Sequence, residues 1–443
     1  MDHLSDLPKH ILDDILSRLP EEDAARTSIL SKGLNDTWST SSILRFSQQK
    51  YVYGVRHGVE LERKRNKFVE LVEKTLTRFH NQCLAIREFK LHMKHSDPQS
   101  IYPPPYRHLY CLPANILYAK SLIKLKLEYV KLGVKDPFQF SSLQELTLSR
   151  VTASDEQTIQ NIISSCPLLE HLSLISCHVQ GQNGFCLNYV RISGLSKLKT
   201  LVAVDVKEID IDAPNVEDLH YRPPCDTVPS KINLDMFKNL NKLNLSILSI
   251  SNQWLVELFL KFPFLESLKL SRCNSSEKIK ISSTHLKVLE FKNTNLKEVN
   301  IDAPNLCSLR YGHSDVKLPI LSFLTNSSLL QVDITIMFFM CFWTLKRIRQ
   351  LLQSLEHANI NQASLSLEIL WLDRKLNLLE LRDVSVPPPS IKHLNLRINP
   401  RLCYDLSDLI TGFLCYCHPT TISMRQGLES NSLIEVFVGI AKF

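Results

Sequence analysis

Two short stretches carry the residue types of metal or catalytic sites. The run from Cys415 to His418 (Cys-Tyr-Cys-His) offers two thiols and an imidazole, which are zinc ligands, but no second pair of ligands follows at zinc-finger spacing. The run from His313 to Asp315 (His-Ser-Asp) holds the residue types of a hydrolytic triad. Consecutive residues of a strand or turn point in different directions, so they cannot form a hydrogen-bonded relay. Neither stretch supports an enzyme or a metal centre.

Composition argues against nucleotide and nucleic-acid sites. Only 11 of the 443 residues are glycine, well below the roughly 7% of average proteins, and the glycine-rich phosphate-binding motifs do not occur. The net charge of +7 arises from 52 basic and 45 acidic residues that are interleaved along the chain. A nucleic-acid interface needs clustered basic residues rather than a small excess. We therefore expect no catalytic activity, no cofactor and no nucleic-acid partner.

The sequence also bears on the compartment. The N-terminus has neither the basic nor the apolar region of a secretory signal. The longest uncharged apolar stretch, Ile334 to Leu345, is shorter than the about 20 residues that span a bilayer. We expect a protein of the nucleus or cytoplasm with no membrane partner, in which the 12 cysteines are reduced and Cys177 and Cys273 are packed as small apolar residues.

A leucine pattern recurs over most of the chain. Leu169, Leu172 and Leu174 stand in the frame Leu-x-x-Leu-x-Leu, and the same frame returns from Leu265 onward. Its starting positions are Leu122, Leu143, Leu169, Leu198, Val216, Leu240, Leu265, Leu286, Leu306 and Leu329. The nine intervals between them average 23 residues. This spacing resembles the leucine-rich repeat.

The frame has a simple structural reading. Its second and third leucines point to one side of a short strand, and the residue between them points to the other side. One unit cannot bury its leucines alone, so successive units stack their strands in parallel around a shared core. Weaker frames near Ile86 and Ile391 extend the predicted solenoid over residues 86–400. We expect the poorest strand register between residues 198 and 230, where the spacing is irregular.

The first part of the chain does not follow this repeat. Ile11, Ile15 and Leu19 recur at helical spacing, Pro20 ends that helix, and two further amphipathic stretches follow up to Phe46. Three helices in about 40 residues cannot bury so many apolar side chains among themselves. Part of this surface therefore needs a partner, or else the helices cap the end of the solenoid.

Specific motifs place these helices in a family. The string from Leu7 to Pro20 (Leu-Pro-Lys-His-Ile-Leu-Asp-Asp-Ile-Leu-Ser-Arg-Leu-Pro), followed by Ala25 to Lys32 (Ala-Arg-Thr-Ser-Ile-Leu-Ser-Lys), resembles a plant F-box. The family usually continues with Arg-Trp, where this chain has Gly33-Leu34. The Asp-Ala-Pro-Asn turns that end at Asn215 and Asn305 are similar to those of plant F-box/leucine-rich-repeat proteins.

The resemblance implies a function. F-boxes dock a Skp-type adaptor, which tethers them to the cullin and RING subunits of an SCF-type ubiquitin ligase, and the repeats then hold a protein target for ubiquitylation. The positions that match the docking motif are Leu7, Pro8, Ile11, Ile15, Leu16, Leu19, Pro20, Leu30 and Leu34. Two alternatives stay open: a non-proteolytic F-box scaffold or decoy, and a small-molecule receptor that binds a protein co-ligand on its repeat face.

The expected fold is α/β, a leucine-rich-repeat horseshoe solenoid of roughly 10–14 repeats preceded by a small three-helix F-box domain. We assign residues 4–46 to the F-box, 47–85 to a helical connector or cap, 86–400 to the repeats and 401–443 to a C-terminal region. That region is similar to the start of the FBD-like segment of many family members, and we expect a truncated form of it.

One surface is the candidate for target binding. In each repeat the residue between the two strand leucines faces away from the core. These positions are polar and of both signs, which suits a protein surface of mixed charge or a small polar ligand. The charged residues nominated by this rule are Lys126, Lys269, Glu290 and Arg310, and Thr147, Ser173 and Asn244 hold the same position in other repeats.

Overall fold

The fold is that of a computed structural model, and it divides into two compact units, Met1–Lys238 and Asn239–Phe443. The structure describes residues 7–19, 21–52, 54, 59–93, 109–113, 116, 119–133, 138–181, 186–224, 233–246, 249–275, 278–313, 319–324, 331–340, 353, 363–372, 390–398, 414, 417–426 and 433–437.

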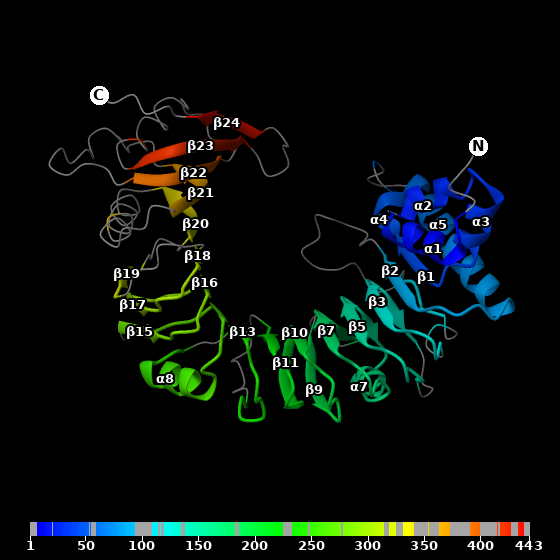
Figure 1. The fold of residues 1–443 in the computed structure, drawn as a ribbon, viewed down its shortest axis with the longest axis horizontal. Coiled ribbons are helices and arrows are strands. Elements are labelled where there is room, and N and C mark those ends of the chain that lie inside the picture. Colours follow the sequence, from blue (N-terminus) through cyan, green and yellow to red (C-terminus); the bar gives the residue numbers. More distant parts are fainter. Residues whose placement is uncertain are drawn as a thin grey trace. The chain divides into compact units, whose positions relative to one another are not determined.

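Helices occupy the start of the first unit (Figure 1). They are α1 (Lys9–Arg18), α2 (Glu21–Thr27) and α3 (Lys32–Ser39). Pro8 directly precedes α1, where its missing N–H costs no helical hydrogen bond. The hydroxyl of Ser31 accepts a hydrogen bond from the backbone N–H of Leu34 at 3.2 Å and so caps α3. Helices α1 and α3 contact each other.

The segment after α3 enters the main sheet at once. Strand β1 (Ile43–Ser47) pairs in parallel with β2 (Glu88–His92), and the helices α4 (Gln48–Tyr51) and α5 (Val59–Asn81) lie between them in sequence. Helix α5 buries Phe68, Val72 and Leu76 at helical spacing, whereas Leu71 is 44% exposed because it lies off that stripe. The strand that ends the helical segment is therefore the first strand of the repeat sheet.

The sheet of the first unit is parallel throughout. After β1 and β2 it continues with β3 (Lys124–Glu128), β5 (Glu145–Ser149), β7 (His171–Ile175), β10 (Thr200–Val204) and β12 (Asp218–Arg222). The second residue of each strand lies opposite the second residue of the next strand, so that Leu125, Leu146 and Leu172 are in register. All three are at most 1% exposed. The predicted stacking of repeat leucines is confirmed within this unit.

Further elements lie between these strands in the sequence. They are β4 (Lys131–Leu132), β6 (Thr152–Ala153), α7 (Glu156–Ser164), β8 (His178–Val179), β9 (Leu187–Ser193) and β11 (Val206–Asp212). Asp155 caps α7 by accepting a hydrogen bond from the backbone N–H of Thr158 at 2.7 Å. Strands β4, β6 and β8 form one small parallel sheet, and β9 and β11 form another.

The expected irregularity between residues 198 and 230 is not found where the structure describes this range. Strands β10 and β12 pair over all five of their residues. The short interval between them is taken up by the extended β11 and the Asp-Ala-Pro-Asn turn. Asn215 of that turn donates its side-chain N–H to the carbonyl of Ser196 at 2.7 Å, and Asn305 of the second copy donates to Thr284 at 2.7 Å. In both copies the turn therefore forms a hydrogen bond to the preceding repeat.

The second unit repeats this plan. Its main sheet holds β13 (Lys242–Ser246), β14 (Ser267–Ser271), β16 (Val288–Lys292), β18 (Ser308–His313), β20 (Gln331–Met340), β21 (Ala363–Leu372), β22 (Ser390–Ile398), β23 (His418–Gln426) and β24 (Leu433–Phe437). Its strands pair in parallel except β24, which is antiparallel to β23. Leu243, Leu268 and Leu289 are in register and at most 1% exposed. The core prediction is confirmed here too.

Behind this second sheet lie α8 (Asn252–Lys261), β15 (Lys278–Ser282), β17 (Glu298–Asp302) and β19 (Ile320–Phe323). Ser251 caps α8 by accepting a hydrogen bond from the backbone N–H of Trp254 at 3.2 Å. The repeats within each unit form a solenoid-like stack of parallel strands. The horseshoe of both units together stays a prediction.

A left-handed residue follows six of the main-sheet strands. The residues are Tyr129, Arg150, Ser176, Asp205, Arg272 and Asn293, with φ between 49° and 59°. The backbone N–H of each donates to a carbonyl at the end of the next strand, as from Arg150 to Ile175 at 2.7 Å and from Asn293 to Gly312 at 2.7 Å. A left-handed conformation costs a non-glycine residue about 1–2 kcal/mol. The added hydrogen bond to the neighbouring repeat offsets this cost.

Candidate protein-interaction surfaces

The structure divides the nominated adaptor-binding residues by exposure. Leu7, Pro8, Ile11 and Leu30 are exposed, Ile15 and Leu19 are half-buried, Leu16 and Leu34 are buried, and Pro20 lies outside the described residues. Leu16 and Leu34 are 5% and 3% exposed on the contacting helices α1 and α3. They pack the helical segment itself. Leu34 of the unusual Gly33-Leu34 pair thus takes a core position.

The end of α2 presents the largest apolar exposure in this segment. Ile29 and Leu30 are 84% and 73% exposed. They lie in a turn closed by hydrogen bonds from their backbone N–H groups to Arg26 and Thr27, at 3.2 and 3.0 Å. Because the turn points both side chains outward, neither reaches the core, and burying one fully would gain about 1.5–3 kcal/mol. Ile29 is missing from the nominated set, although two successive apolar residues in a turn are a signal for exposure.

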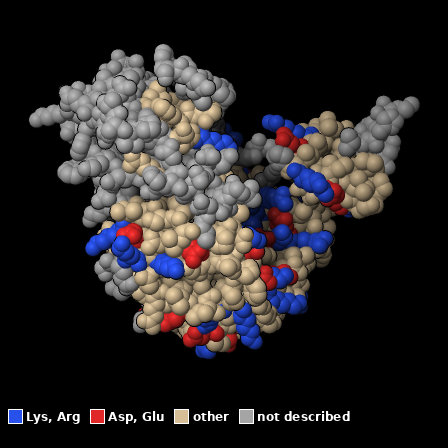
Figure 2. Space-filling view, turned by 60° about the vertical axis from the view of Figure 1, so that its left-hand side comes forward, with Lys and Arg blue, Asp and Glu red and all other residues tan. Residues whose placement is uncertain are grey.

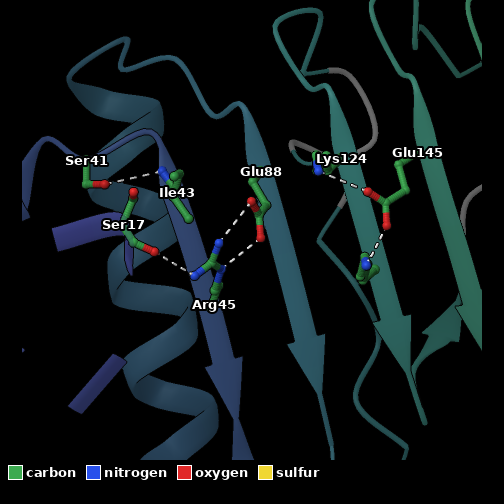
Figure 3. Close-up of polar contacts among 8 residues, drawn as sticks. Ser17, Ser41, Ile43, Arg45, Glu88, Lys124 and Glu145 are labelled. Atoms are coloured by element: carbon green, nitrogen blue, oxygen red, sulfur yellow. Dashed lines mark hydrogen bonds and ion pairs between the residues drawn. The ribbon is translucent and has the colours of Figure 1, made fainter. Parts of the chain in front are cut away.

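Arg45 joins the helical segment to the sheet. Its guanidinium donates to the Glu88 carboxylate, from Nε at 2.8 Å and from Nη2 at 3.2 Å, and from Nη1 to the carbonyl of Ser17 in α1 at 3.1 Å. Figure 3 shows the side chains of Arg45 and Glu88 meeting between β1 and β2. A planar guanidinium suits such a two-point contact. Helix α1 and strands β1 and β2 are thereby held by one side chain.

A second carboxylate lies two strands further along. The carboxylate of Glu145 in β5 forms an ion pair with the Lys124 ammonium group at 3.2 Å (Figure 3). It forms a second ion pair with Lys126, and both lysines belong to β3. Burial by itself would raise the pKa of Glu145, but the hydrogen bonds from Lys126 and Lys124 outweigh it and lower the pKa below the ordinary 4.5. This carboxylate stays ionised and keeps both lysines in place.

The nominated target-binding residues lie on the exposed face of the sheets. Lys269, Glu290 and Arg310 are register neighbours on adjacent strands of the second unit. Lys269 approaches Glu290 at 3.4 Å, and Arg310 approaches Asp333 at 3.8 Å. Much of the charge in this row is therefore paired within the chain. Figure 2 likewise shows basic and acidic side chains lying next to one another on the described part of the surface.

Two further residues meet the criterion that selected the target-binding candidates, which is a strand position between two core side chains. Arg45 stands between the buried Leu44 and Phe46, and Lys90 stands between the buried Phe89 and Leu91. Both occupy the strand position between two core side chains. The signal was weak because the first strand lies inside the F-box motif and the second fits the leucine frame loosely. Lys126, the nominated residue of the first unit, is the next register neighbour of Lys90.

The residues with potential for metal or acid–base chemistry do not form a cluster in the described part of the chain. Cys417 is 1% exposed, and burial raises the pKa of its thiol to about 12. His418 is exposed at the start of β23, and Cys415, Ser314 and Asp315 lie outside the described residues. Groups of three metal-ligating side chains do not occur in the described part of the chain. Cys177 and Cys273 are buried, as expected for packed repeat residues.

Three family descriptions match successive parts of the chain. Residues 4–46 match the F-box domain, residues 91–235 match the leucine-rich repeats of the FBD-associated F-box protein At5g56370, and residues 223–414 match the leucine-rich-repeat domain of At1g61320/AtMIF1. None of these descriptions names a catalytic domain. Among the described helices, none is long and apolar enough to cross a membrane.

Similar curated proteins come from Arabidopsis thaliana. The FBD-associated F-box protein At3g52670 is 25% identical over 292 residues, which is 56% of this chain and 66% of that protein. The F-box/FBD/LRR-repeat protein At3g51530 is 30% identical over 219 residues, 46% of this chain and 45% of that protein. The protein At5g22660 of the same description is 28% identical over 194 residues, 39% of this chain and 40% of that protein. The chain thus spans between 40% and 66% of the length of these relatives.

Proposed function

This chain belongs to the plant F-box/leucine-rich-repeat family, and on that premise we propose that it is the substrate-recognition subunit of an SCF-type ubiquitin ligase. Its three N-terminal helices form the F-box that docks a Skp-type adaptor, which connects it to the cullin and RING subunits. Its repeats hold a protein target. The chain contributes no catalytic residue to ubiquitin transfer, and we propose the nucleus and cytoplasm as its compartments.

The observation that carries this proposal is the exposed apolar surface of the F-box segment. Leu30 and Ile29 at the end of α2 are 73% and 84% exposed, and Leu7 and Ile11 at the start of α1 are 37% and 39% exposed. Exposed leucine and isoleucine side chains in a small domain mark a surface that gains free energy when a partner covers it. Leu16 of α1 and Leu34 of α3 are buried, so these two helices contact each other and keep their own core.

The repeats supply the second half of the proposed function. Lys126, Lys269, Glu290 and Arg310 lie on strand faces that carry charges of both signs. A rigid array of parallel strands holds these groups at fixed spacing, so it can match a complementary protein surface. We propose that these residues contact the target directly.

Replacing Leu30 with Asp tests the adaptor contact. The side chain is exposed, so we expect the chain to fold while co-precipitation of a Skp-type adaptor falls at least about tenfold, because a buried unpaired charge costs several kcal/mol in an interface. Leu260→Asp is the matched control, since Leu260 is 77% exposed on α8 of the second unit. Wild-type chain that retains no adaptor, or equal losses in both variants, would remove the basis for the ligase assignment.

A second measurement separates a ligase subunit from a scaffold or decoy. Proteins that co-purify with the wild-type chain in plant cells should carry ubiquitin chains and should accumulate in cells that express Leu30→Asp. Partners that are captured without ubiquitin, and whose abundance is the same with both chains, would favour the scaffold.

A further inference from the structure

Three cations lie side by side where the repeat sheet begins. Arg45, Lys90 and Lys126 are register neighbours on β1, β2 and β3. Adjacent strands are about 4.8 Å apart, so like charges at neighbouring positions repel and weaken the strand pairing. An arrangement that costs stability in the free protein points to a ligand that relieves the repulsion.

The outer two cations form ion pairs with carboxylates that are less exposed to solvent than the cations are. Glu88 holds Arg45, and Glu145 holds Lys126. The side chains of both cations are 39% exposed, against 18% for Glu88 and 19% for Glu145. The carboxylates lie on the same face of the strands as the cations and fix two of them in place, while the cations are the more exposed partners of each pair. Figure 3 shows Arg45 and Glu145 on this stretch of β1 to β5.

Lys90, in the middle of the row, is different. It is exposed, and the described part of the structure gives it no carboxylate partner within ion-pair distance. Its register neighbours on both sides are cations. An anionic group placed over Lys90 would interact with three positive charges at once, two of which are already oriented.

We propose that the row Arg45–Lys90–Lys126 binds an acidic segment of the protein that the repeats capture. This inference rests on the proposed function and specifies its target as a protein with clustered Asp, Glu or phosphorylated side chains. A row that crosses three strands of an open sheet face spans about 10 Å, which suits a chain laid across the strands with two or three negative groups. Because Arg45 also contacts Ser17 of α1 at 3.1 Å, the bound segment would lie beside the F-box.

Binding of a fluorescein-labelled peptide of alternating Glu and Ser residues tests the inference. The purified full-length chain is titrated into the peptide at low salt, and fluorescence anisotropy is measured. We expect Lys90→Glu to weaken binding at least about tenfold, and wild-type binding to weaken as salt rises. Lys292→Glu is the matched control, because Lys292 is an exposed lysine on the strand face of the second unit, and we expect it to change binding less than about twofold.

Three outcomes would overturn the inference. Equal losses in the two variants would mean that the net charge of the chain, and not the row, attracts the peptide. Inorganic pyrophosphate that binds as tightly as the peptide, with the same loss in Lys90→Glu, would make a free anion the ligand. Unchanged peptide binding in Lys90→Glu would leave the row without a role. A repeat of the titration with the same peptide phosphorylated at its Ser residues shows which source of negative charge is preferred.

The unliganded protein gives an independent readout. If the row is repulsive, Lys90→Gln should raise the melting temperature by about 1 °C while it weakens peptide binding, and a lower melting temperature would contradict the repulsion. Adaptor co-precipitation with the same variants keeps the two proposals apart. A wild-type chain that binds the adaptor but not the peptide overturns only the acidic-segment inference, and a wild-type chain that binds the peptide but not the adaptor overturns only the ligase assignment.

Discussion

Arg45 and Glu88 form a two-point ion pair across the first two parallel strands, with Nε–Oε1 at 2.8 Å and Nη2–Oε2 at 3.2 Å. Arg45 belongs to the segment that matches the F-box, and Glu88 belongs to the segment that begins the repeats. The F-box segment and the first repeats therefore share one sheet. An adaptor bound to the helices would be held at a fixed angle to the first repeats.

We predict a measurable coupling between these two residues. Arg45→Ala or Glu88→Ala should lower the free energy of unfolding of the chain by roughly 1–2 kcal/mol, because the pair is partly buried and charge-assisted. The double variant should cost less than the sum of the single ones. A double-mutant cycle measured by urea denaturation checks this, and strictly additive costs would show that the contact contributes nothing. Arg191→Ala and Asp210→Ala, from a more exposed pair at 3.5 Å, serve as the control cycle.

A second prediction concerns the left-handed residue after β16. Asn293 has φ of 52° and donates its backbone N–H to Gly312 at 2.7 Å. Asn293→Val should destabilise the protein by about 1–2 kcal/mol, because a β-branched side chain clashes in this conformation, whereas Asn293→Gly should be neutral or stabilising. Thermal unfolding checks the order of the three proteins. Asn300→Val in β17 is the control, since strands favour valine. Equal melting temperatures for Val and Gly at position 293 would contradict the prediction.

A third prediction is a loss of stability in mild acid. His178 is 6% exposed and lies 2.8 Å from the Thr152 hydroxyl through its Nε2. Burial lowers the pKa of His178 below 6.5, and a hydrogen bond that the imidazole donates to the backbone carbonyl of Ser176 offsets this only in part. As pH falls below 6.5 the unfolded chain takes up a proton that the folded chain resists, so the free energy of unfolding decreases.

Between pH 7.5 and 5.5 the contribution of His178 should fall by up to about 1 kcal/mol. Urea denaturation of the wild type and of His178→Gln at both pH values isolates this effect, because the two proteins differ only at position 178. The variant should lose less stability on acidification than the wild type does. An equal or larger loss in His178→Gln would show that this imidazole does not set the acid sensitivity.

Local spacing along the chain is enough to specify the repeat and its core. The leucines of each frame are neighbours along one strand, and a strand buries alternate residues whatever its surroundings, so the burial of Leu146, Leu172 and Leu268 follows from local spacing. The order of helices before sheet follows in the same way, from the change between helical and strand periodicity and from Pro20. Local periodicity and backbone sterics suffice for these features.

Which of these side chains are exposed to a partner depends on the tertiary fold. Leu16 and Leu30 both belong to the F-box motif. Leu16 is buried on α1, which contacts α3, whereas Leu30 is exposed on a turn. The pairing of Lys269 with Glu290, and the row that puts Lys90 between Arg45 and Lys126, depend on which strands become neighbours. The ion pair of Arg45 and Glu88 likewise joins residues 43 positions apart in sequence. A linear pattern specifies the side of a strand that a residue occupies, whereas its charge environment is set by strands that stacking brings within about 5 Å.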